Sequence, residues 1–267
     1  MMNNYRPIQP PKLQQIQSPD YSYQEYVPCE SLASHVVCYW TMDFHAKNKN
    51  QLHRILPDGC VDIIVDRQST SSWKAAFVEG LMTRFEVLSL SKYQSLFGIR
   101  FYPEAAHSIL KFPASSFIGQ HVFLEDIWGM EGLFMVEEIL SIQAVSKIIE
   151  IVERKLNHLL ALNNTSTNSL LLESMQYIYG FKGSISTLVL AEKLSFTERH
   201  MRRIFDRELG LSPKEMLGIV RFQSILQELY SGTSTNFTDI ALKYGYYDQS
   251  HFIKNFKRYY GILPKQL

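Results

Sequence analysis

This 267-residue chain lacks the marks of several common protein classes. Its three cysteines, Cys29, Cys38 and Cys60, are too irregularly spaced for a disulfide framework or a Cys-x-x-Cys metal site, so we expect buried free thiols. No apolar run reaches the ~18 residues of a membrane span. The polar start, MMNNYRP, also lacks the apolar segment of a signal peptide. We therefore expect a cytoplasmic protein with no membrane partner.

A metal-binding pattern is also missing from the first half of the chain. A metal-binding barrel of the cupin class would carry a His-x-His pair and a later glutamate. The candidate side chains, His45, His53, Cys60 and Asp62, do not have that spacing. We expect neither a metal nor another cofactor.

Neither sign of charge dominates, and the net charge is only +1. The charges are unevenly distributed, however. Residues 170–267 hold 13 Lys and Arg against 9 Asp and Glu, whereas residues 1–169 hold 14 against 17. A mildly basic final third fits a surface that faces phosphate groups. The overall composition, 46% hydrophobic and 20% charged, is that of a globular protein long enough for two domains.

The first part of the chain shows the pattern of a sheet. After an extended lead-in at 1–20, short β-branched and aromatic runs follow one another without helical spacing. These runs lie at 36–40, 61–65, 75–78 and 96–101. Asp58-Gly59 is expected to form a hairpin turn between two apolar runs. Arg100 lies inside an apolar strand, where an ion pair with Asp62 or another carboxylate is favoured over an anionic ligand.

Helical patterns begin after Pro103, at 104–110 and 134–162. The stripe of the helix near 145–160 could pack on its own domain or on a second chain. We predict a two-domain α+β protein. Residues 21–162 would form an antiparallel, β-rich, barrel-like domain that ends in helices, residues 163–169 a polar linker, and residues 170–267 an all-helical domain with two helix-turn-helix motifs.

The C-terminal domain contains one pattern twice. AEKL at 191–194 matches ALKY at 241–244, with an offset of 50 residues. Later positions match with an offset of 51, so the second copy has one extra residue in its central turn. These pairs are Met201 and Phe252, Phe205 and Phe256, Gly210 and Gly261, and Pro213 and Pro264. In each copy two short helices and a tight turn precede Gly-x-x-Pro, which is typical of a helix-turn-helix unit that reads DNA.

Residues that favour helix starts support these boundaries. Ser186 and Thr197 can cap the two helices of the first copy, and Asn236 and Asp248 those of the second. Between the copies, Ser212-Pro213-Lys214-Glu215 has the spacing of a capping box and predicts a helix to about residue 230. A helix of 18 residues spans roughly 27 Å. That length suits two recognition helices that enter adjacent major grooves ~34 Å apart.

The second helix of each copy carries the candidate DNA contacts. In the first copy, Arg199, Arg202 and Arg203 project away from the apolar stripe, and a guanidinium can pair with guanine or hold a phosphate. The equivalent positions of the second copy hold other side chains that can reach an adenine edge, a thymine methyl or a phosphate. They are Gln249, Ser250, Ile253 and Lys254. Because the two sets differ, we expect each chain to bind an asymmetric site.

Residues 170–267 resemble the DNA-binding domain of the AraC/XylS family of bacterial transcription regulators. The resemblance rests on LAEKL at 190–194, RHMRRIF at 199–205, GLSP at 210–213, IALKYGY at 240–246, SHF at 250–252 and FKRYYGILP at 256–264. It implies that the outward residues of both second helices contact bases. RILPDGCVDII at 54–64, GIRF at 98–101 and LEDIWG at 124–129 are similar to an N-terminal domain found in a subset of that family. This second likeness implies a β-rich sensor or dimerisation module with no common ligand.

Together these patterns predict a transcription regulator and not an enzyme. Its partners would be double-stranded promoter or operator DNA, a small-molecule effector, RNA polymerase and a second copy of the chain. One alternative is a DNA-repair enzyme of the alkyl-transfer type fused to the same reading unit. That enzyme would need a cysteine cluster to hold zinc and accept the alkyl group, and three scattered cysteines do not supply one. A second alternative is a DNA binder without sequence preference, against which the arginines at base-facing positions argue.

Overall fold

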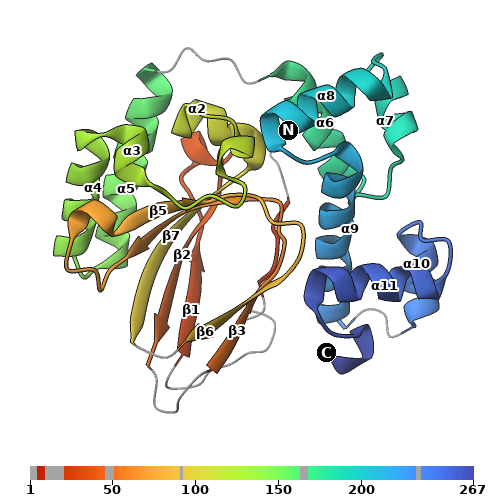
Figure 1. The fold of residues 1–267 in the computed structure, drawn as a ribbon, viewed down its shortest axis with the longest axis horizontal. Coiled ribbons are helices and arrows are strands. Elements are labelled where there is room, and N and C mark those ends of the chain that lie inside the picture. Colours follow the sequence, from red (N-terminus) through yellow and green to blue (C-terminus); the bar gives the residue numbers. More distant parts are fainter. Residues whose placement is uncertain (1–4, 10–20, 46–50, 91–92, 163–167, 233–235) are drawn as a thin grey trace.

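The computed structural model describes residues 5–9, 21–45, 51–90, 93–162, 168–232 and 236–267. The chain forms a β-rich N-terminal part and an all-helical C-terminal part that lie side by side (Figure 1). This arrangement confirms the predicted α+β fold class. The five residues 163–167 of the predicted linker lie outside the described residues.

The N-terminal part contains two antiparallel sheets. The larger has the strand order β1-β2-β7-β4-β5-β8, and β3 pairs with β6 in the smaller. The larger sheet consists of β1 (Tyr21–Tyr26), β2 (Val36–Phe44), β4 (Val61–Asp66), β5 (Ala76–Glu79), β7 (Gln94–Phe101) and β8 (Val122–Phe123). The smaller consists of β3 (Gln51–Ile55) and β6 (Glu86–Leu90). Each of the four predicted apolar runs overlaps a strand of the larger sheet.

One face of the larger sheet packs on helices. In β4 the side chains of Val61, Ile63 and Val65 are fully buried, and they alternate with partly exposed ones, as expected for a strand with one covered face. The helices on this side are α3 (Leu124–Trp128), α4 (Met130–Ser141) and α5 (Val145–Leu162) (Figure 1). The apolar stripe of α5, with Ile148 and Val152, is buried within its own domain. That finding answers the question left open by the sequence.

The remaining short helices of the N-terminal part flank the sheet. They are η1 (Glu30–Leu32), η2 (Ser72–Lys74), η3 (Pro103–Ala105), α2 (Ala106–Leu110) and η4 (Ala114–Phe117). The helical pattern predicted at 104–110 is thus divided between η3 and α2, because Pro103 opens a tighter 3₁₀ turn before the α-helix begins.

The expectation of a hairpin at Asp58-Gly59 is wrong. Strand β3, before this turn, pairs with β6, whereas β4, after it, pairs with β5 and β7. The turn therefore carries the chain from the smaller sheet to the larger one. Its residue types predict a chain reversal correctly but do not determine which strand pairs with which.

The prediction for Arg100 is confirmed. Arg100 is 4% exposed, and its guanidinium donates from Nη2 to Asp62 Oδ2 at 2.9 Å. It also lies 3.2 Å from Asp58 Oδ2. A buried guanidinium is costly unless it is paired, and two carboxylates satisfy that requirement here.

The C-terminal part is helical, with α6 (Ser169–Gly180), α7 (Thr187–Lys193), α8 (Glu198–Leu209), α9 (Pro213–Tyr230), α10 (Phe237–Lys243), α11 (Gln249–Tyr260) and the short η5 (Pro264–Gln266). The caps form as the sequence predicts. Thr197 accepts from the N–H of His200, and Asp248 from that of His251. Ser212 and Glu215 form the reciprocal capping box at the start of α9.

Within the described ranges, no helix is long and apolar enough to cross a membrane. The same residues contain no group of three or more His, Cys, Asp or Glu side chains arranged to hold a metal ion.

Candidate nucleic-acid interface

Two helix-turn-helix units are built with the same backbone pattern. Helices α7 and α8 form the first unit, and α10 and α11 the second. In the first turn, Phe196 donates its N–H to the carbonyl of Ala191 at 3.0 Å; in the second, Tyr246 donates to Ala241 at 2.9 Å. The sequence repeat is therefore also a structural repeat.

The extra residue of the second unit is Tyr247. The offset between the copies is 50 up to Tyr246 and 51 from Asp248 onward, so Tyr247 occupies the inserted position. Its side chain is 91% exposed, immediately before the residue that caps α11. An aromatic side chain so fully exposed has no packing role among the residues that the structure describes.

The inner faces of α8 and α11 hold each unit together. Met201 and Phe205 of α8 are fully buried, as is Phe252 of α11, and Phe256 is 1% exposed. The ring of Phe256 packs edge-on against Phe222 of α9, with centroids 5.5 Å apart. Helix α9 thus shares its core with the second unit and connects it to the first (Figure 1).

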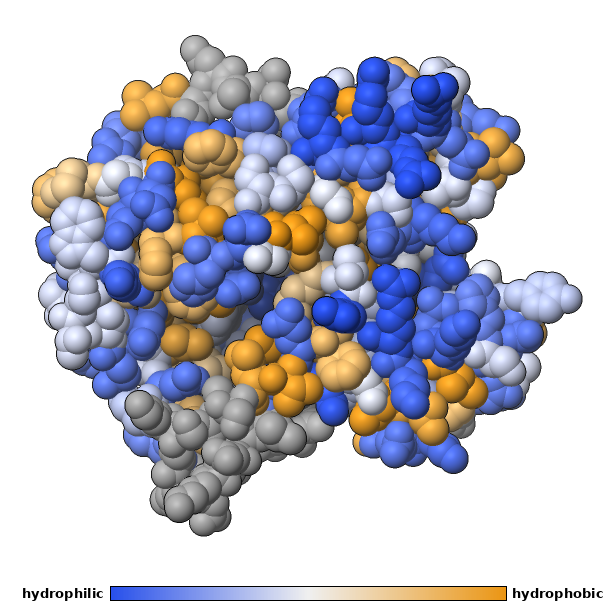
Figure 2. Space-filling model, viewed as in Figure 1, coloured by the Kyte–Doolittle hydropathy of each residue, from blue (hydrophilic) through white to orange (hydrophobic). Residues whose placement is uncertain are grey.

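The outer face of α8 is strongly cationic. Arg199, Arg202 and Arg203 are all exposed. Arg202 is 3.7 Å from Asp206 one turn later, and Arg203 contacts Nδ1 of His200 at 3.2 Å. These contacts are solvent-exposed and therefore weak, which leaves the guanidinium groups available to a stronger anion. Figure 2 shows hydrophilic side chains gathered over α8.

A shallow hollow of about 450 Å³ lies beside these arginines. Arg199 and Arg202 line one side of it, and Lys214, the second residue of α9, lines another. Sequence reasoning did not include Lys214 among the candidate contacts. The sequence does indicate its position, because a lysine directly after Ser212-Pro213 must lie in the first turn of α9, next to the first helix-turn-helix unit.

The outer face of α11 is less charged than that of α8. Gln249, Ser250 and Lys254 are exposed, as a DNA-contacting face requires. The amide oxygen of Gln249 accepts a long hydrogen bond, 3.4 Å, from Thr238 of α10. Ile253 differs from the other candidates because it is half-buried and packs on the core. Its position on the helix lies between the inner and outer faces.

All three cysteines are free; Cys38 and Cys60 are buried, but Cys29 is only partly buried, so the expectation of buried thiols is wrong for Cys29. Burial raises the pKa of the Cys38 thiol to about 12 and that of Cys60 well above its usual value. A thiol in this state forms little thiolate, which is the reactive species. The environment of these two side chains does not favour a nucleophilic role.

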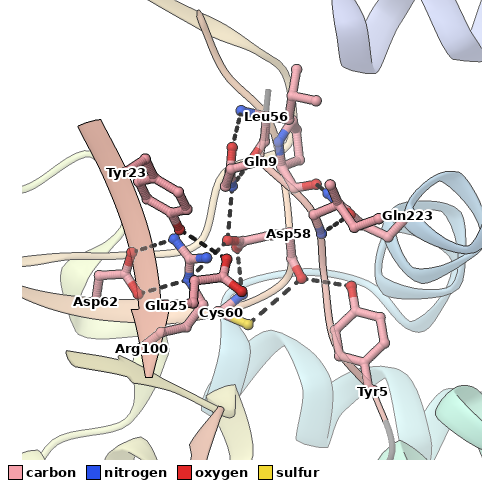
Figure 3. Close-up of polar contacts among 12 residues, drawn as sticks. Tyr5, Gln9, Tyr23, Glu25, Leu56, Asp58, Cys60, Asp62, Arg100 and Gln223 are labelled. Atoms are coloured by element: carbon pink, nitrogen blue, oxygen red, sulfur yellow. Dashed lines mark hydrogen bonds and ion pairs between the residues drawn. The ribbon is translucent and has the colours of Figure 1, made fainter. Parts of the chain in front are cut away.

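A second polar cluster lies inside the N-terminal part (Figure 3). Burial raises the pKa of Asp62, and the neighbouring Arg100 opposes that shift. Burial alone would lower the pKa of Arg100, but Asp62 and Asp58 raise it well above its usual value. Each charge of the pair therefore offsets part of the cost of burying the other. Gln9 extends the cluster by donating to Asp58 Oδ2 at 2.9 Å.

Comparisons with known proteins agree with this geometry. Residues 190–267 match a family described as "Helix-turn-helix domain", and residues 24–123 match one described as "Domain of unknown function (DUF6597)". The chain is 32% identical over 98 residues to the HTH-type transcriptional activator AarP of Providencia stuartii, covering 36% of this chain and 72% of that protein. It is 27% identical over 126 residues to the lactose operon transcription activator of Staphylococcus xylosus, covering 47% of this chain and 45% of that protein.

An uncharacterized HTH-type transcriptional regulator of Haemophilus influenzae is 38% identical over 77 residues, which cover 29% of this chain and 26% of that protein. The chain thus spans less than half the length of two of these three relatives. Among solved structures it is similar to ToxT from Vibrio cholerae O395, with a TM-score of 0.39 and 14% identity over 93% of this chain and 97% of that one. The match to AarP and the doubled helix-turn-helix unit lead to one conclusion: this chain belongs to the AraC/XylS family of transcription regulators.

Proposed function

We propose that this protein regulates transcription by binding a specific promoter or operator sequence through both helix-turn-helix units. The observation that carries the proposal is the pairing of one buried scaffold with two different exposed faces. Because the core and the turn are repeated, α8 and α11 would enter the DNA major groove in the same orientation. Their different outer side chains would then read different bases.

The length of the helix between the units suits the insertion of both recognition helices into successive major-groove segments. Helix α9 has 18 residues, so its axis spans roughly 27 Å. Successive major-groove faces on one side of DNA are ~34 Å apart. The thickness of the helices at each end of α9 makes up the difference. One chain would therefore contact two segments about one helical turn apart.

The roles of the outer side chains follow from their chemistry. Arg199, Arg202 and Arg203 would supply guanine and phosphate contacts in the first segment. Gln249 would read adenine in the second segment, Ser250 and Lys254 would contact bases or phosphates, and Ile253 would touch a thymine methyl or a sugar. Lys214 would add a phosphate contact beside the first segment.

We infer that the N-terminal part controls this binding in response to a small-molecule effector or a protein partner. Such control requires that the effector bind two arrangements of the protein unequally. Direct hydrogen bonds between the two parts, such as that from Tyr179 to Glu104 at 3.1 Å, would couple a change in the N-terminal part to the DNA-binding part. Contact with RNA polymerase and pairing of two chains are further parts of this proposal. The buried thiols of Cys38 and Cys60 do not favour the alternative of an alkyl-transfer enzyme.

Binding to selected DNA tests the proposal. Fragments that the full-length protein retains from a random pool would be sequenced, and the affinity for the selected site compared with that for a scrambled one. Arg202→Ala should cost about 1–3 kcal/mol on the selected site and relax its specificity at one position. Arg154→Ala, which removes an arginine that is 73% exposed on α5, is the matched control and should bind normally. Equal affinity of the wild-type protein for selected and scrambled DNA would overturn the proposal.

A further inference from the structure

The N-terminal part touches both helix-turn-helix units at equivalent positions. We propose that these contacts hold the two recognition helices at a fixed separation and rotation, so that the N-terminal part determines which spacing of DNA segments the protein accepts. The inference rests on the proposed function, because spacing has a meaning only if both units bind DNA. It identifies Ile118 and Phe85 as positioning residues outside the DNA-binding domain.

The first contact lies at the end of α8. Gly210 follows the last residue of this helix, and a Cβ on it would lie 2.6 Å from Cδ1 of Ile118. Ser115 of η4 donates from Oγ to the carbonyl of Arg207 in the last turn of α8, at 2.6 Å. The end of the first recognition helix is therefore both packed and hydrogen-bonded against the N-terminal part.

The second contact lies at the end of α11. Gly261, the repeat partner of Gly210, follows the last residue of this helix, and a Cβ on it would lie 2.6 Å from Cζ of Phe85. Arg54 of β3 lies over the rings of Phe85 and Tyr260, 5.5 Å and 5.8 Å from their centroids. The same point of each recognition helix is thus contacted by a different segment of the N-terminal part.

Between these two points the N-terminal part also contacts the middle of α9 (Figure 3). The Gln223 side chain is fully buried; its Nε2 donates to the carbonyl of Pro57 at 2.8 Å, and its Oε1 accepts from the N–H of Ile8 at 2.8 Å. Asp58, next to Pro57, is paired with the buried Arg100 of the larger sheet. The contact on α9 is therefore connected to the interior of the N-terminal part and not to a surface loop alone.

These contacts leave the DNA-facing side chains free. Arg199, Arg202 and Arg203 occupy the N-terminal half of α8, whereas Gly210 lies beyond its C-terminal end. The same holds for Gln249 and Gly261 in α11. The N-terminal part can consequently hold both helices while their opposite ends contact DNA.

Fixing the C-terminal ends of both recognition helices restricts which DNA sites the protein can bind. Adding one base pair between two segments moves the second by ~3.4 Å and rotates it by ~35° about the DNA axis. Helix α9 connects the two units through one junction at each end, the capping box at its start and the packing of Phe222 on Phe256 towards its end. Contacts at three points restrict bending and twisting at both junctions, so a site with altered spacing would meet only one recognition helix correctly.

The test measures affinity as a function of spacing. The full-length protein would be titrated on its selected site and on versions with one or two base pairs added or removed between the segments. Ile118→Ala and Phe85→Ala would be compared with wild type, and Ser115→Ala provides a milder change at the first contact. Phe112→Ala is the control, because Phe112 is an exposed aromatic residue of the same domain.

The wild-type protein and Phe112→Ala should prefer one spacing by about tenfold or more over its neighbours, a difference of ~1.4 kcal/mol. In Ile118→Ala and Phe85→Ala that preference should shrink to about threefold or less, and in Ser115→Ala it should shrink by a smaller factor. A variant that is merely less stable would lose affinity for every spacing by the same factor. If Ile118→Ala and Phe85→Ala kept the spacing preference of the wild-type protein, the inference would be overturned. Wild-type protein without any preferred sequence would instead overturn the proposed function itself.

Discussion

Ser195 and Gly245 occupy the same position in two copies of one turn, and both have a positive φ, +57° and +71°. The next residue in each copy donates its N–H back to an equivalent alanine, Ala191 or Ala241. The left-handed conformation costs an L-residue roughly 1–2 kcal/mol, and glycine avoids that cost. The second unit therefore has the relaxed version of the turn and the first unit the strained one.

We predict opposite effects for exchanges at these two positions. Gly245→Ala should lower the free energy of unfolding by about 1 kcal/mol. The Cβ of the new alanine has space, so the cost comes only from holding an alanine at a positive φ. Ser195→Gly should be neutral or stabilising by up to ~1 kcal/mol. Urea unfolding measures both. The control is Gly180→Ala, at a helical glycine where an added Cβ meets open space, and this change should not destabilise the protein. Equal losses of stability at residues 180 and 245 would contradict the assignment of strain to the turn.

The stability of the interface between the two parts should depend on pH through Glu104. Burial raises the pKa of this carboxyl to about 7, and the Tyr179 hydroxyl that donates to it only partly opposes the shift. Because the folded-state pKa lies above the unfolded value of ~4.3, the folded state binds the proton more tightly. Its contribution to stability is fully present below about pH 4 and is lost as the pH rises through about 7.

Glu104→Gln keeps this side chain neutral at every pH. The variant should lose less stability than wild type between pH 5 and 8, with a difference on the order of 3 kcal/mol at pH 8. Thermal unfolding across this range measures the effect, and Glu173→Gln, on the exposed face of α6, is the control. Parallel pH profiles for wild type and Glu104→Gln would show that the buried carboxyl does not titrate as described.

Gln223 is predicted to be a stabilising contact between the two parts. Gln223→Leu nearly keeps the volume but leaves the buried Pro57 carbonyl and the partly buried Ile8 N–H without their partner. The cost should be about 1–3 kcal/mol for each unsatisfied group. Gln68→Leu, at an exposed position, should change the unfolding free energy by less than ~0.5 kcal/mol. If both variants unfolded at the same urea concentration, the buried amide would not have the role assigned to it.

Tyr247 is predicted to contact the DNA backbone. It precedes the cap of α11, and a helix about 10–12 Å thick fills the ~12 Å major groove, so the preceding residue must pass the phosphates at the groove edge. Tyr247→Phe, which removes only the hydroxyl, should weaken binding a few-fold on every sequence alike. Tyr93→Phe, at an exposed tyrosine of the N-terminal part, serves as the control. A loss restricted to particular base pairs would contradict a backbone contact.

Local features of this fold could be predicted from the sequence, because short-range chemistry determines them. Thr197, Ser212 and Asp248 cap helices since each side chain needs only an N–H two or three residues away. The pair of Arg100 and Asp62 was predictable because a cation inside an apolar strand requires a carboxylate. The repeat was visible because two equal cores need equal apolar spacing.

Contacts between distant segments could not be predicted in this way. Gln223 and Pro57 are 166 residues apart, and nothing in either neighbourhood indicates the other. Asp58-Gly59 shows the limit for turns, since the expected hairpin depended on strand pairing that tertiary packing determines. Ile253 shows the limit for helix faces, because a residue near the edge of the apolar stripe can be half-buried without a change in spacing.

Hydroxyl-radical footprinting of the full-length protein on its selected DNA site tests the central claim most directly. Two protected segments should appear on one face of the DNA, with centres ~10 base pairs apart. Arg202→Ala should weaken protection of one segment, and Lys254→Ala that of the other. A single protected segment, or protection of random DNA equal to that of the selected site, would contradict the claim that one chain reads two sequences with one repeated scaffold.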